Sequence, residues 1–418
     1  MAQDRRFEDA QKVMAALETG GYRAMLAGGC VRDRLLGRSP KDYDVATTAR
    51  PDVVSSIFAH LGIRVVPTGL DHGTLTLVMR AGPIEVTTLR RDVATDGRRA
   101  TIAFADDFVE DAARRDFTIN AMYEARDGTI HDYFDGQKHL AERRLAFVGD
   151  TRTRIREDYL RILRFFRFWA VLGFGVDAAD ETLISEEAGG LSQVSQERIT
   201  HELWLIAATT DPSVMVDSMR AHGVLERILP APFQMPPDGI LRALGQLGDQ
   251  LRPLARIMAF YLPSRSEEEV ASLSQILRLS GKVRQSLKVL LYGPRLLDTL
   301  PTAPELRMEF LDWCEDTSPD LRANDCLSIW DLCRRNNGTN QLKELIHLEG
   351  ADGAMRRMSK KHLPITGRDI MNTLHLSSGA SIGRYLSELR RAYRRRDWTK
   401  REEGLELLKG MATAGPKA

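Results

Sequence analysis

The chain has 418 residues, of which 43% are hydrophobic and 28% are charged. This composition excludes a disordered or low-complexity protein, and the length exceeds one ordinary core, so we expect two to four folded domains. Lys and Arg number 59 against 58 Asp and Glu, so no net charge points to a polyanionic partner, although clustered arginines can still bind phosphate locally.

Nothing in the sequence indicates export or a membrane span. The N-terminal stretch MAQDRRFEDA lacks the apolar core of a signal peptide, and no run of about 18 apolar residues occurs. The four cysteines have neither C-x-x-C nor metal-ligand spacing, which predicts reduced thiols at Cys30, Cys314, Cys326 and Cys333. We therefore expect a cytoplasmic protein.

Helices and strands are mixed in the first third of the chain. The predicted elements, in chain order, are a helix over 7–19, a strand in YRAMLAGG, a helix over 30–37, and strands in KDYDVATT, VVPTG, GTLTLVMR and IEVTTLR. The segment 89–107 reads as a polar loop. From about residue 154 onward, helical periodicity dominates, with breaks at Gly and Pro clusters. The prediction is an α+β fold with a mixed-sheet head followed by helical domains, divided as 1–145, 146–226, 227–355 and 356–418.

Two aspartates, Asp42 and Asp44, stand one residue apart in a predicted strand. Side chains at i and i+2 of a strand point to the same face, and two adjacent carboxylates repel unless a cation such as Mg²⁺ lies between them. Glu85, on another predicted strand, could reach the same place. Three acids on neighbouring strands suit two metal ions about 4 Å apart, which is a site for phosphoryl or nucleotidyl transfer. Taken alone, a D-x-D pair is more often a solvated strand end.

A glycine turn precedes these acids. Gly28 and Gly29 lead into a predicted helix, where backbone N–H groups can approach a phosphate, and Arg32 on the first turn would lie near such an anion. A Gly-Gly pair alone is usually only a tight turn, so the combination with the aspartates carries the interpretation.

The combination resembles a known family. GG-x-V-R-D followed by D-x-D is similar to the signature of the polymerase-β-type nucleotidyltransferase head of class II tRNA nucleotidyltransferases (CCA-adding enzymes) and bacterial poly(A) polymerases. Further stretches resemble the family's second, base-recognition and structural motifs, in the family's order: ARRDFTINAMYE at 113–124, RIREDYLRILRFFRF at 154–168 and ERITHEL at 197–203. The resemblance covers about the first half of the chain and implies a catalytic head, a base-recognising neck, a body, and a tail that contacts tRNA.

The second motif contains Arg115 and Asp116. The resemblance implies that Arg115 binds the triphosphate, as guanidinium groups can, and that Asp116 selects a ribonucleotide through its 2′-OH. An isolated R-R-D would be a salt-bridged surface turn.

The base-recognition motif places charged residues at regular intervals. Asp158, Arg161 and Arg164 recur every three residues and would share one broad face of a helix, with Arg167 further round. An ordinary amphipathic helix has the same pattern. The resemblance assigns base recognition to Asp158 and Arg161, and further nucleotide contacts to the other two.

Hydrogen-bonding chemistry agrees with that assignment. A carboxylate only accepts hydrogen bonds and a guanidinium only donates them. Cytosine and adenine each present an amino donor beside a ring-nitrogen acceptor, whereas uracil and guanine present the reverse, and a buried mismatch costs on the order of 1–3 kcal/mol. Asp158 and Arg161 could therefore select C or A without a nucleic-acid template.

The implied activity is addition of CCA to the 3′ end of tRNA from CTP and ATP, with two Mg²⁺ ions and release of pyrophosphate. In the family that the chain resembles, an intact segment here accompanies addition of the final A, so the full length of 89–107 favours complete CCA synthesis. Three alternatives remain open. A poly(A) polymerase shares the head but carries a basic stretch where this chain has PTGLDHGTLTLV. A silent RNA-binding protein is disfavoured by the intact motif residues, and a small-molecule nucleotidyltransferase by the long helical appendage.

Three further segments contain residues whose role the resemblance does not decide. DYFDGQKHL, with Asp135-Gly136-Gln137 and His139, departs from the family's glycine-rich spring between head and neck, so its mechanics are not transferred. His131-Asp132 lacks the other ligands of an HD phosphohydrolase and is assigned no metal. The basic stretch 383–402, with Tyr385, Tyr393 and Trp398, fits a solvated helix and an RNA contact equally well.

Overall fold

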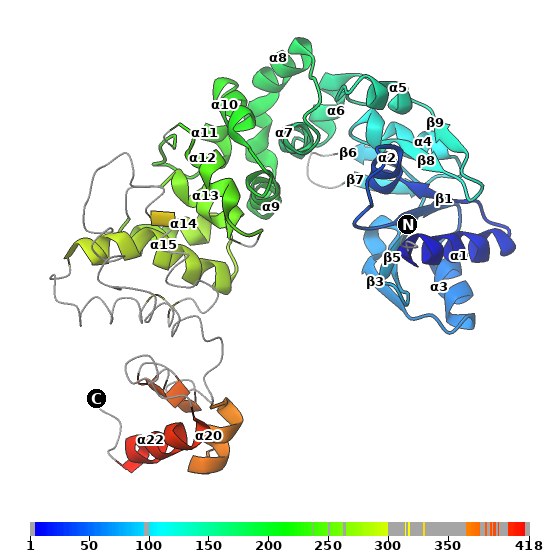
Figure 1. The fold of residues 1–418 in the computed structure, drawn as a ribbon. Coiled ribbons are helices and arrows are strands. Elements are labelled where there is room, and N and C mark those ends of the chain that lie inside the picture. The colour runs from blue at the N-terminus through cyan, green and yellow to red at the C-terminus, as the bar shows by residue number, and fades with distance from the viewer. Residues whose placement is uncertain are drawn as a thin grey trace. The chain divides into compact units, whose positions relative to one another are not determined.

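The computed structural model describes residues 5–95, 100–236, 238–249, 251–261, 265–299, 365–376 and 400–413, with a few single positions between 314 and 392. The chain forms two compact units, Met1–Ala231 and Pro232–Ala418 (Figure 1). The predicted division into four domains stays a prediction.

A seven-stranded mixed sheet organises the first unit. Its strand order is β3-β4-β5-β2-β1-β8-β9, and β2 and β5 are its parallel pair. The bounds are β1 Ala24–Ala27, β2 Asp44–Thr47, β3 Val65–Gly69, β4 Thr74–Val78, β5 Pro83–Thr88, β8 Met122–Glu124 and β9 Ile130–Asp132. Each strand predicted up to residue 88 is present, although one of them begins later than predicted. The register pairs Asp44 with Glu85, so these two acids lie side by side on adjacent strands.

Two sequence predictions in the head are wrong. The strand predicted from KDYDVATT begins only at Asp44, and Asp42 lies in a bend before it. The segment 89–107 is not a loop, because β6 (Arg90–Thr95) and β7 (Ala100–Phe104) pair as a two-stranded antiparallel sheet. These strands contain β-branched residues such as Val93 and Ile102, which favour extended backbone, and the pairing of the two strands overrides the polar composition.

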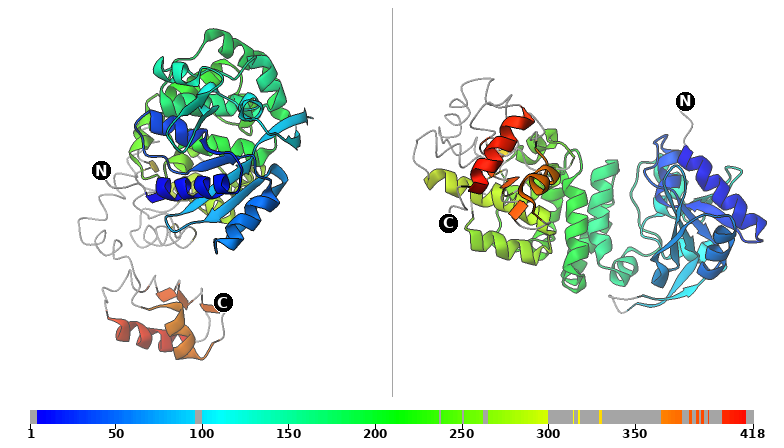
Figure 2. Two further views of the ribbon diagram at one scale, coloured as in Figure 1. Left: turned by 90° about the vertical axis from the view of Figure 1, so that its right-hand side faces the viewer. Right: turned by 90° about the horizontal axis from the view of Figure 1, so that it is seen from below.

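Two helices cover one face of the sheet. Helix α1 (Arg5–Thr19) packs against β1, β2 and β5, while α3 (Pro51–His60) packs against β3, β4 and α1. The apolar side chains of α1 recur at helical spacing, and Val13, Met14 and Leu17 are fully buried. Figure 2 shows these helices in blue beside the strands of the head. This packing fixes the strands whose ends carry the acids.

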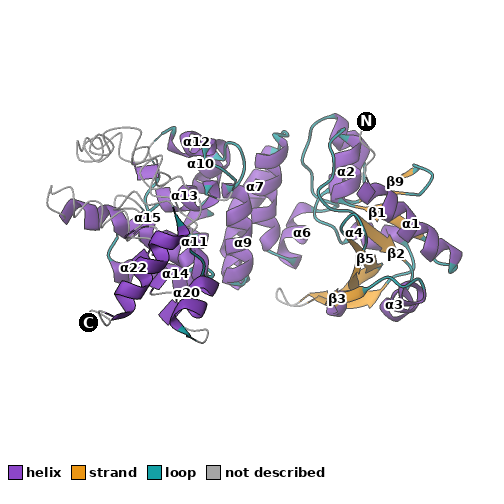
Figure 3. Cartoon of the chain, turned by 60° about the horizontal axis from the view of Figure 1, so that its bottom comes forward, coloured by secondary structure: helices purple, strands orange, loops and turns teal. Residues whose placement is uncertain are grey.

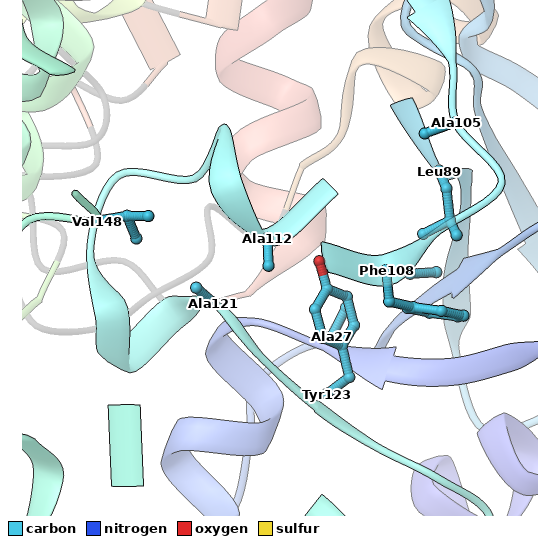
Figure 4. Packing of buried hydrophobic residues seen from close by; sticks show 9 residues of the cluster. Ala27, Leu89, Ala105, Phe108, Ala112, Ala121, Tyr123 and Val148 are labelled. Carbon is cyan, nitrogen blue, oxygen red and sulfur yellow. The ribbon is translucent and has the colours of Figure 1, made fainter. Parts of the chain in front are cut away.

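A second core anchors the segment that holds the R-R-D motif. Phe108 and Tyr123 pack edge to face with ring centroids 5.0 Å apart, at the centre of a buried cluster in the head (Figure 4). Phe108 begins α4 (Phe108–Ala113), which is followed by η2 (Thr118–Asn120). The cluster therefore holds residues 114–116, between these two helices, next to β1.

The described strands all lie before residue 133, and the described elements after it are helices (Figure 3). In the first unit the remaining helices are α2 Gly29–Leu35, η1 Leu70–His72, α5 Gly136–Ala141, α6 Thr151–Glu157, α7 Leu160–Leu172, α8 Ala178–Glu187, η3 Ala188–Gln193, α9 Gln196–Ala207, α10 Ser213–Ala221 and α11 Leu225–Ile228. Aromatic rings join α7 to the head, since Phe165 stacks on Phe147 at 5.8 Å and Phe168 meets Phe117 at 5.4 Å. The charged residues of α7 are thereby held against the head.

The second unit is helical in its described part. Its helices are α12 Ile240–Ala243, η4 Leu244–Gln246, α13 Arg252–Ala259, α14 Glu267–Ile276, α15 Gly281–Thr299, α20 Gly367–Leu374 and α22 Arg401–Thr413. Ile365, Ile370, Leu389 and Leu408 form a buried cluster. Most of the basic stretch 383–402 lies outside the described residues, so its predicted RNA contact stays a prediction.

The predictions about the cysteines and about membrane spans can also be compared with the described residues. Cys30 and Cys314 are buried free thiols, as predicted, whereas Cys326 and Cys333 lie outside the described residues. None of the helices that the structure describes is both long enough and apolar enough to cross a membrane.

Candidate active site

One cavity of about 1130 Å³ in the first unit brings together all the residues predicted for the catalytic, metal and nucleotide sites. Its walls come from β2, β5, α2, the segment after α4, α7 and α9. The predicted residues that line it are Gly28, Gly29, Arg32, Asp42, Asp44, Glu85, Arg115, Asp116, Asp158, Arg161, Arg164 and Arg167.

The carboxylates gather where β2 begins. Burial, together with the neighbouring charges of Glu85 and Asp42, raises the pKa of Asp44 to about 6, although Arg115 acts to lower it. Asp42 is different, because its side chain is 78% exposed and lies 4.0 Å from the guanidinium of Arg6. The half-buried Asp44 is therefore repelled by neighbouring carboxylates more than Arg115 compensates.

This donor set fits Mg²⁺. The ion prefers oxygen ligands and commonly takes one or two carboxylates while keeping water and phosphate oxygens as its remaining ligands. A cation beside Asp44 would offset the repulsion that raises its pKa. Within the described part of the chain, no three His, Cys, Asp or Glu side chains form a ready-made metal site. The fit is thus to the pair Asp42 and Asp44, and Glu85 is not a preformed third ligand.

Gly28 is required by the close approach of Arg115. Its φ of 73° is in the region that favours glycine, and an added Cβ would lie 2.6 Å from Nη1 of Arg115. The Gly28 N–H donates to the carbonyl of Met122 at 3.1 Å. The turn therefore makes room for a guanidinium, and its first N–H is already used.

Arg32 is buried between the head and α7. Its Nη1 donates to Asn120 at 2.7 Å and its Nε donates to Asp33 at 2.9 Å. Its guanidinium carbon lies 5.2 Å from the ring centre of Phe168. These contacts fix the cation at the cavity wall.

Asp111 holds both arginines of the R-R-D motif. Its Oδ1 accepts from Arg114 Nη2 at 2.6 Å, and its Oδ2 accepts from Arg115 Nη2 at 3.1 Å and from the Tyr123 hydroxyl at 2.7 Å. Burial alone would raise the pKa of Asp111, but the two guanidinium groups lower it to about 2. Arg115 also donates to the carbonyl of Asn120. A buried carboxylate therefore sets the direction of Arg115.

Asp116 is tied to the neck. Its Oδ1 accepts from the Phe117 N–H at 2.8 Å and from Asn120 at 3.2 Å, and its Oδ2 accepts from Arg164 Nε at 2.7 Å. Burial opposes its charge, yet Arg164 brings the pKa of Asp116 below its ordinary value. The pair joins the second motif to α7.

Asp158 does not lie on the same helix as Arg161. The backbone of Asp158 is extended, with φ −156° and ψ 101°, and it separates α6 from α7. The predicted continuous helix is broken here because the Asp158 carboxylate accepts the Leu160 N–H at 3.2 Å, as a helix cap does. Its two oxygens also accept from Arg198 on α9, at 3.2 and 2.7 Å.

Arg161 is buried and anchored by three acceptors. Its Nη1 donates to Glu157 at 2.6 Å and to the carbonyl of Arg154 at 2.7 Å, and its Nη2 donates to the carbonyl of Arg114 at 2.7 Å. Asp158 and Arg161 both line the cavity, each held by its own set of neighbours.

Glu202 on α9 lies between the two remaining arginines. Its side chain is 4% exposed, and its oxygens lie 3.8 Å from Arg164 Nη1 and 3.3 Å from Arg167 Nε. Burial lowers the pKa of Arg167, and the charge of Arg164 lowers it further, while Glu202 opposes both effects. The arginine pair is therefore held by a buried acid.

Comparison with known proteins agrees with this geometry. Residues 24–146 match the model of the "Poly A polymerase head domain", and residues 173–234 match that of the "Probable RNA and SrmB- binding site of polymerase A". The mitochondrial CCA tRNA nucleotidyltransferase 1 of Danio rerio is 34% identical over 88% of this chain and 83% of its own length. The CCA-adding enzyme of Lacticaseibacillus paracasei is 31% identical over 92% of this chain and 91% of its own.

The chain belongs to the CCA tRNA nucleotidyltransferase family. The family resemblance predicted from the sequence motifs is thereby confirmed.

Solved structures of CCA-adding enzymes share the fold. The Bacillus stearothermophilus CCA-adding enzyme, in complex with CTP, has a TM-score of 0.64, 24% identity and coverage of 99% of both chains. The Thermotoga maritima CCA-adding enzyme, complexed with tRNA, has a TM-score of 0.60 and 18% identity, covering 98% of this chain and 96% of that one.

Sequence reasoning missed several side chains that hold this family site together. Asp111 stands four residues before Arg115, a helical spacing that could have indicated an ion pair. Arg198 and Glu202 belong to ERITHEL, which the motif comparison marked only as structural. Asn120 lies inside the second motif, and nothing in its local sequence indicates its contacts with Arg32 and Asp116.

Proposed function

We propose that this protein adds CCA to the 3′ end of tRNA, using CTP and ATP and releasing pyrophosphate. The observation that carries the proposal is the hydrogen-bonding capacity left on Asp158 and Arg161 at the wall of one cavity.

Asp158 has one acceptor position to spare. A carboxylate offers about four lone-pair positions. Leu160 and Arg198 use two on Oδ1, and Arg198 uses one on Oδ2. Arg161 has five N–H donors and three are engaged, which leaves the Nε–H and one N–H of Nη2.

An acceptor and two donors on the wall of one cavity are complementary to the amino group and ring nitrogen of cytosine or adenine. Uracil and guanine would set acceptor against acceptor and donor against donor, at a cost of about 1–3 kcal/mol for each mismatch. In this proposal, Asp158 and Arg161 select the base.

The other wall of the cavity receives the triphosphate. Arg115, with Gly28 beside it, and Arg32 provide guanidinium donors at the head, and Arg164 and Arg167 add positive charge from α7. In the proposal Asp116, held by the Phe117 N–H, by Asn120 and by both Nε and Nη2 of Arg164, reads the ribose 2′-OH.

Asp42 and Asp44 would hold Mg²⁺, with Glu85 adding negative charge nearby, and two ions are proposed. When bound, Mg²⁺ supplies acidity to the attacking 3′-hydroxyl and neutralises charge on the phosphates. The arginines that line the cavity would position the nucleotide with its phosphates toward these carboxylates.

A poly(A) polymerase is the second candidate, because one matching family model describes a poly(A) polymerase head. The proposal also includes a cytoplasmic location, to be checked by cell fractionation, since relatives such as the one from Danio rerio are mitochondrial by name.

The test is primer extension on a tRNA transcript that lacks CCA. The purified chain with Mg²⁺ receives CTP alone, ATP alone, both, or UTP and GTP, and Asp44→Asn is the inactive control. We expect two additions with CTP and a third only when ATP is also present. A long ladder with ATP alone would identify a poly(A) polymerase. No extension, with tRNA still bound in a gel shift, would contradict the proposal and leave an RNA-binding protein.

A further inference from the structure

Arg198 contacts the base-selecting carboxylate from a distant part of the chain. Its Nη1 and Nη2 donate to Oδ1 and Oδ2 of Asp158 at 3.2 and 2.7 Å, across 40 residues of sequence. A two-pronged pair of this kind fixes the plane of a carboxylate as well as its position. The side chain of Arg198 is 45% exposed and lines the cavity, so the pair lies at the cavity wall.

Asp158 depends on such a contact because its own backbone does not belong to a helix. The residue is extended between α6 and α7, and its one local side-chain bond among the described contacts is to the Leu160 N–H on Oδ1. Nothing local bonds Oδ2, which is the oxygen with an acceptor position to spare.

We infer that Arg198 is a specificity-determining positioning residue, which orients the Asp158 carboxylate so that Oδ2 presents its remaining acceptor position to the amino group of C or A. This inference rests on the proposed function. Arg198 acts through Asp158. Its hydrogen bonds to both carboxylate oxygens prevent the carboxylate from rotating.

Glu202 provides the contrast that isolates this role. It lies four residues after Arg198, hence on the same side of α9, but its carboxylate contacts Arg164 and Arg167 instead. One helix thus supports two groups of cavity residues. Loss of Arg198 should change base selectivity, whereas loss of the Glu202 charge should change nucleotide use without regard to the base.

The expected result for Arg198→Ala is a fall of about tenfold or more in the preference for CTP over UTP, measured as the ratio of kcat/KM values. Arg198→Lys should restore only part of the preference, because an ammonium group lacks the planar fork. With Asp158→Asn as background, the alanine change should add little to the loss, since both changes remove the same interaction.

The matched control is Arg152→Ala. Arg152 is 38% exposed and pairs with Glu186 and Glu187, away from the cavity. It should leave the CTP preference unchanged. Circular dichroism on each full-length variant checks that it is folded, and Arg198→Gln replaces the alanine variant if that one is not.

A second readout separates this inference from the proposed function. Calorimetry of CTP and UTP binding to the full chain needs no turnover. If the wild type extends no tRNA, the proposed function fails, and the binding ratio still tests Arg198. The inference is overturned if folded Arg198→Ala keeps the wild-type CTP-to-UTP ratio in both assays. An equal fall in kcat/KM and in affinity for both nucleotides would leave that ratio unchanged and would also overturn it.

Discussion

Asp111→Asn would remove the charge that holds Arg114 and Arg115 at the wall of the cavity. The Asp111 side chain is 2% exposed, while the two arginine side chains are 17% and 21% exposed. Asparagine keeps the shape and one acceptor oxygen, so the change removes charge more than volume. We expect the head to lose stability and Arg115 to lose its fixed direction.

The pKa of Asp111 sets the size of the effect. A fall from 3.8 to about 2 corresponds to about 2.4 kcal/mol at 1.36 kcal/mol per pKa unit. Because the folded pKa is lower than the unfolded one, this contribution is fully present above about pH 4 and is lost as the pH falls through 2. The variant should therefore be about 2–3 kcal/mol less stable than the wild type at pH 7 and nearly equal to it near pH 2.

Urea unfolding with a brief hydrogen-exchange pulse at one fixed pH measures this difference for the head alone. The peptide to follow is 105–125, which contains α4 and the Asp111 contacts. A loss below about 0.5 kcal/mol at pH 7, or the same loss at pH 7 and pH 2.5, would refute the reasoning from a buried ion-pair centre.

Gly28→Ala should raise the KM for both CTP and ATP about tenfold, because φ 73° strains alanine and its Cβ would lie 2.6 Å from Arg115. Gly21→Ala is the matched control, with φ 87° and no heavy atom within 4 Å of the added Cβ; initial-rate kinetics showing equal KM values in the two variants would contradict the prediction. Glu202→Gln should lower kcat/KM for CTP and ATP by the same factor and destabilise the first unit by about 1–3 kcal/mol, because Arg167 loses its buried counter-charge. Glu187→Gln removes a similarly buried acid outside the cavity and should leave kcat/KM unchanged, so a shifted CTP-to-ATP ratio in Glu202→Gln would count against the argument.

Sequence patterns predicted the elements that depend on local preference. The helix over 7–19 and the strands in VVPTG, GTLTLVMR and IEVTTLR were recognisable because apolar spacing and β-branched residues act within a few positions. Asp44 and Glu85 were predicted to lie close together, and the parallel pairing of their strands places them side by side. Asp42 was misplaced because a strand can begin one or two residues later than its pattern suggests.

Other features depended on contacts that local patterns do not contain. The helical spacing of Asp158 and Arg161 hid a chain break, although an aspartate before an apolar run is itself a helix-start signal. The contact of Asp158 with Arg198 spans 40 residues and exists only in the folded unit. Composition also misled at Arg90–Thr95, where polar residues form a strand because a second strand pairs with it.

The remaining hydrogen-bonding capacity of Asp158 and Arg161 has a consequence for heredity. Under the proposed function, no nucleic-acid template specifies the nucleotides that are added to a tRNA. Two side chains of the protein, Asp158 and Arg161, select them instead. A substitution at either position would then alter the 3′ end of every tRNA that this protein extends.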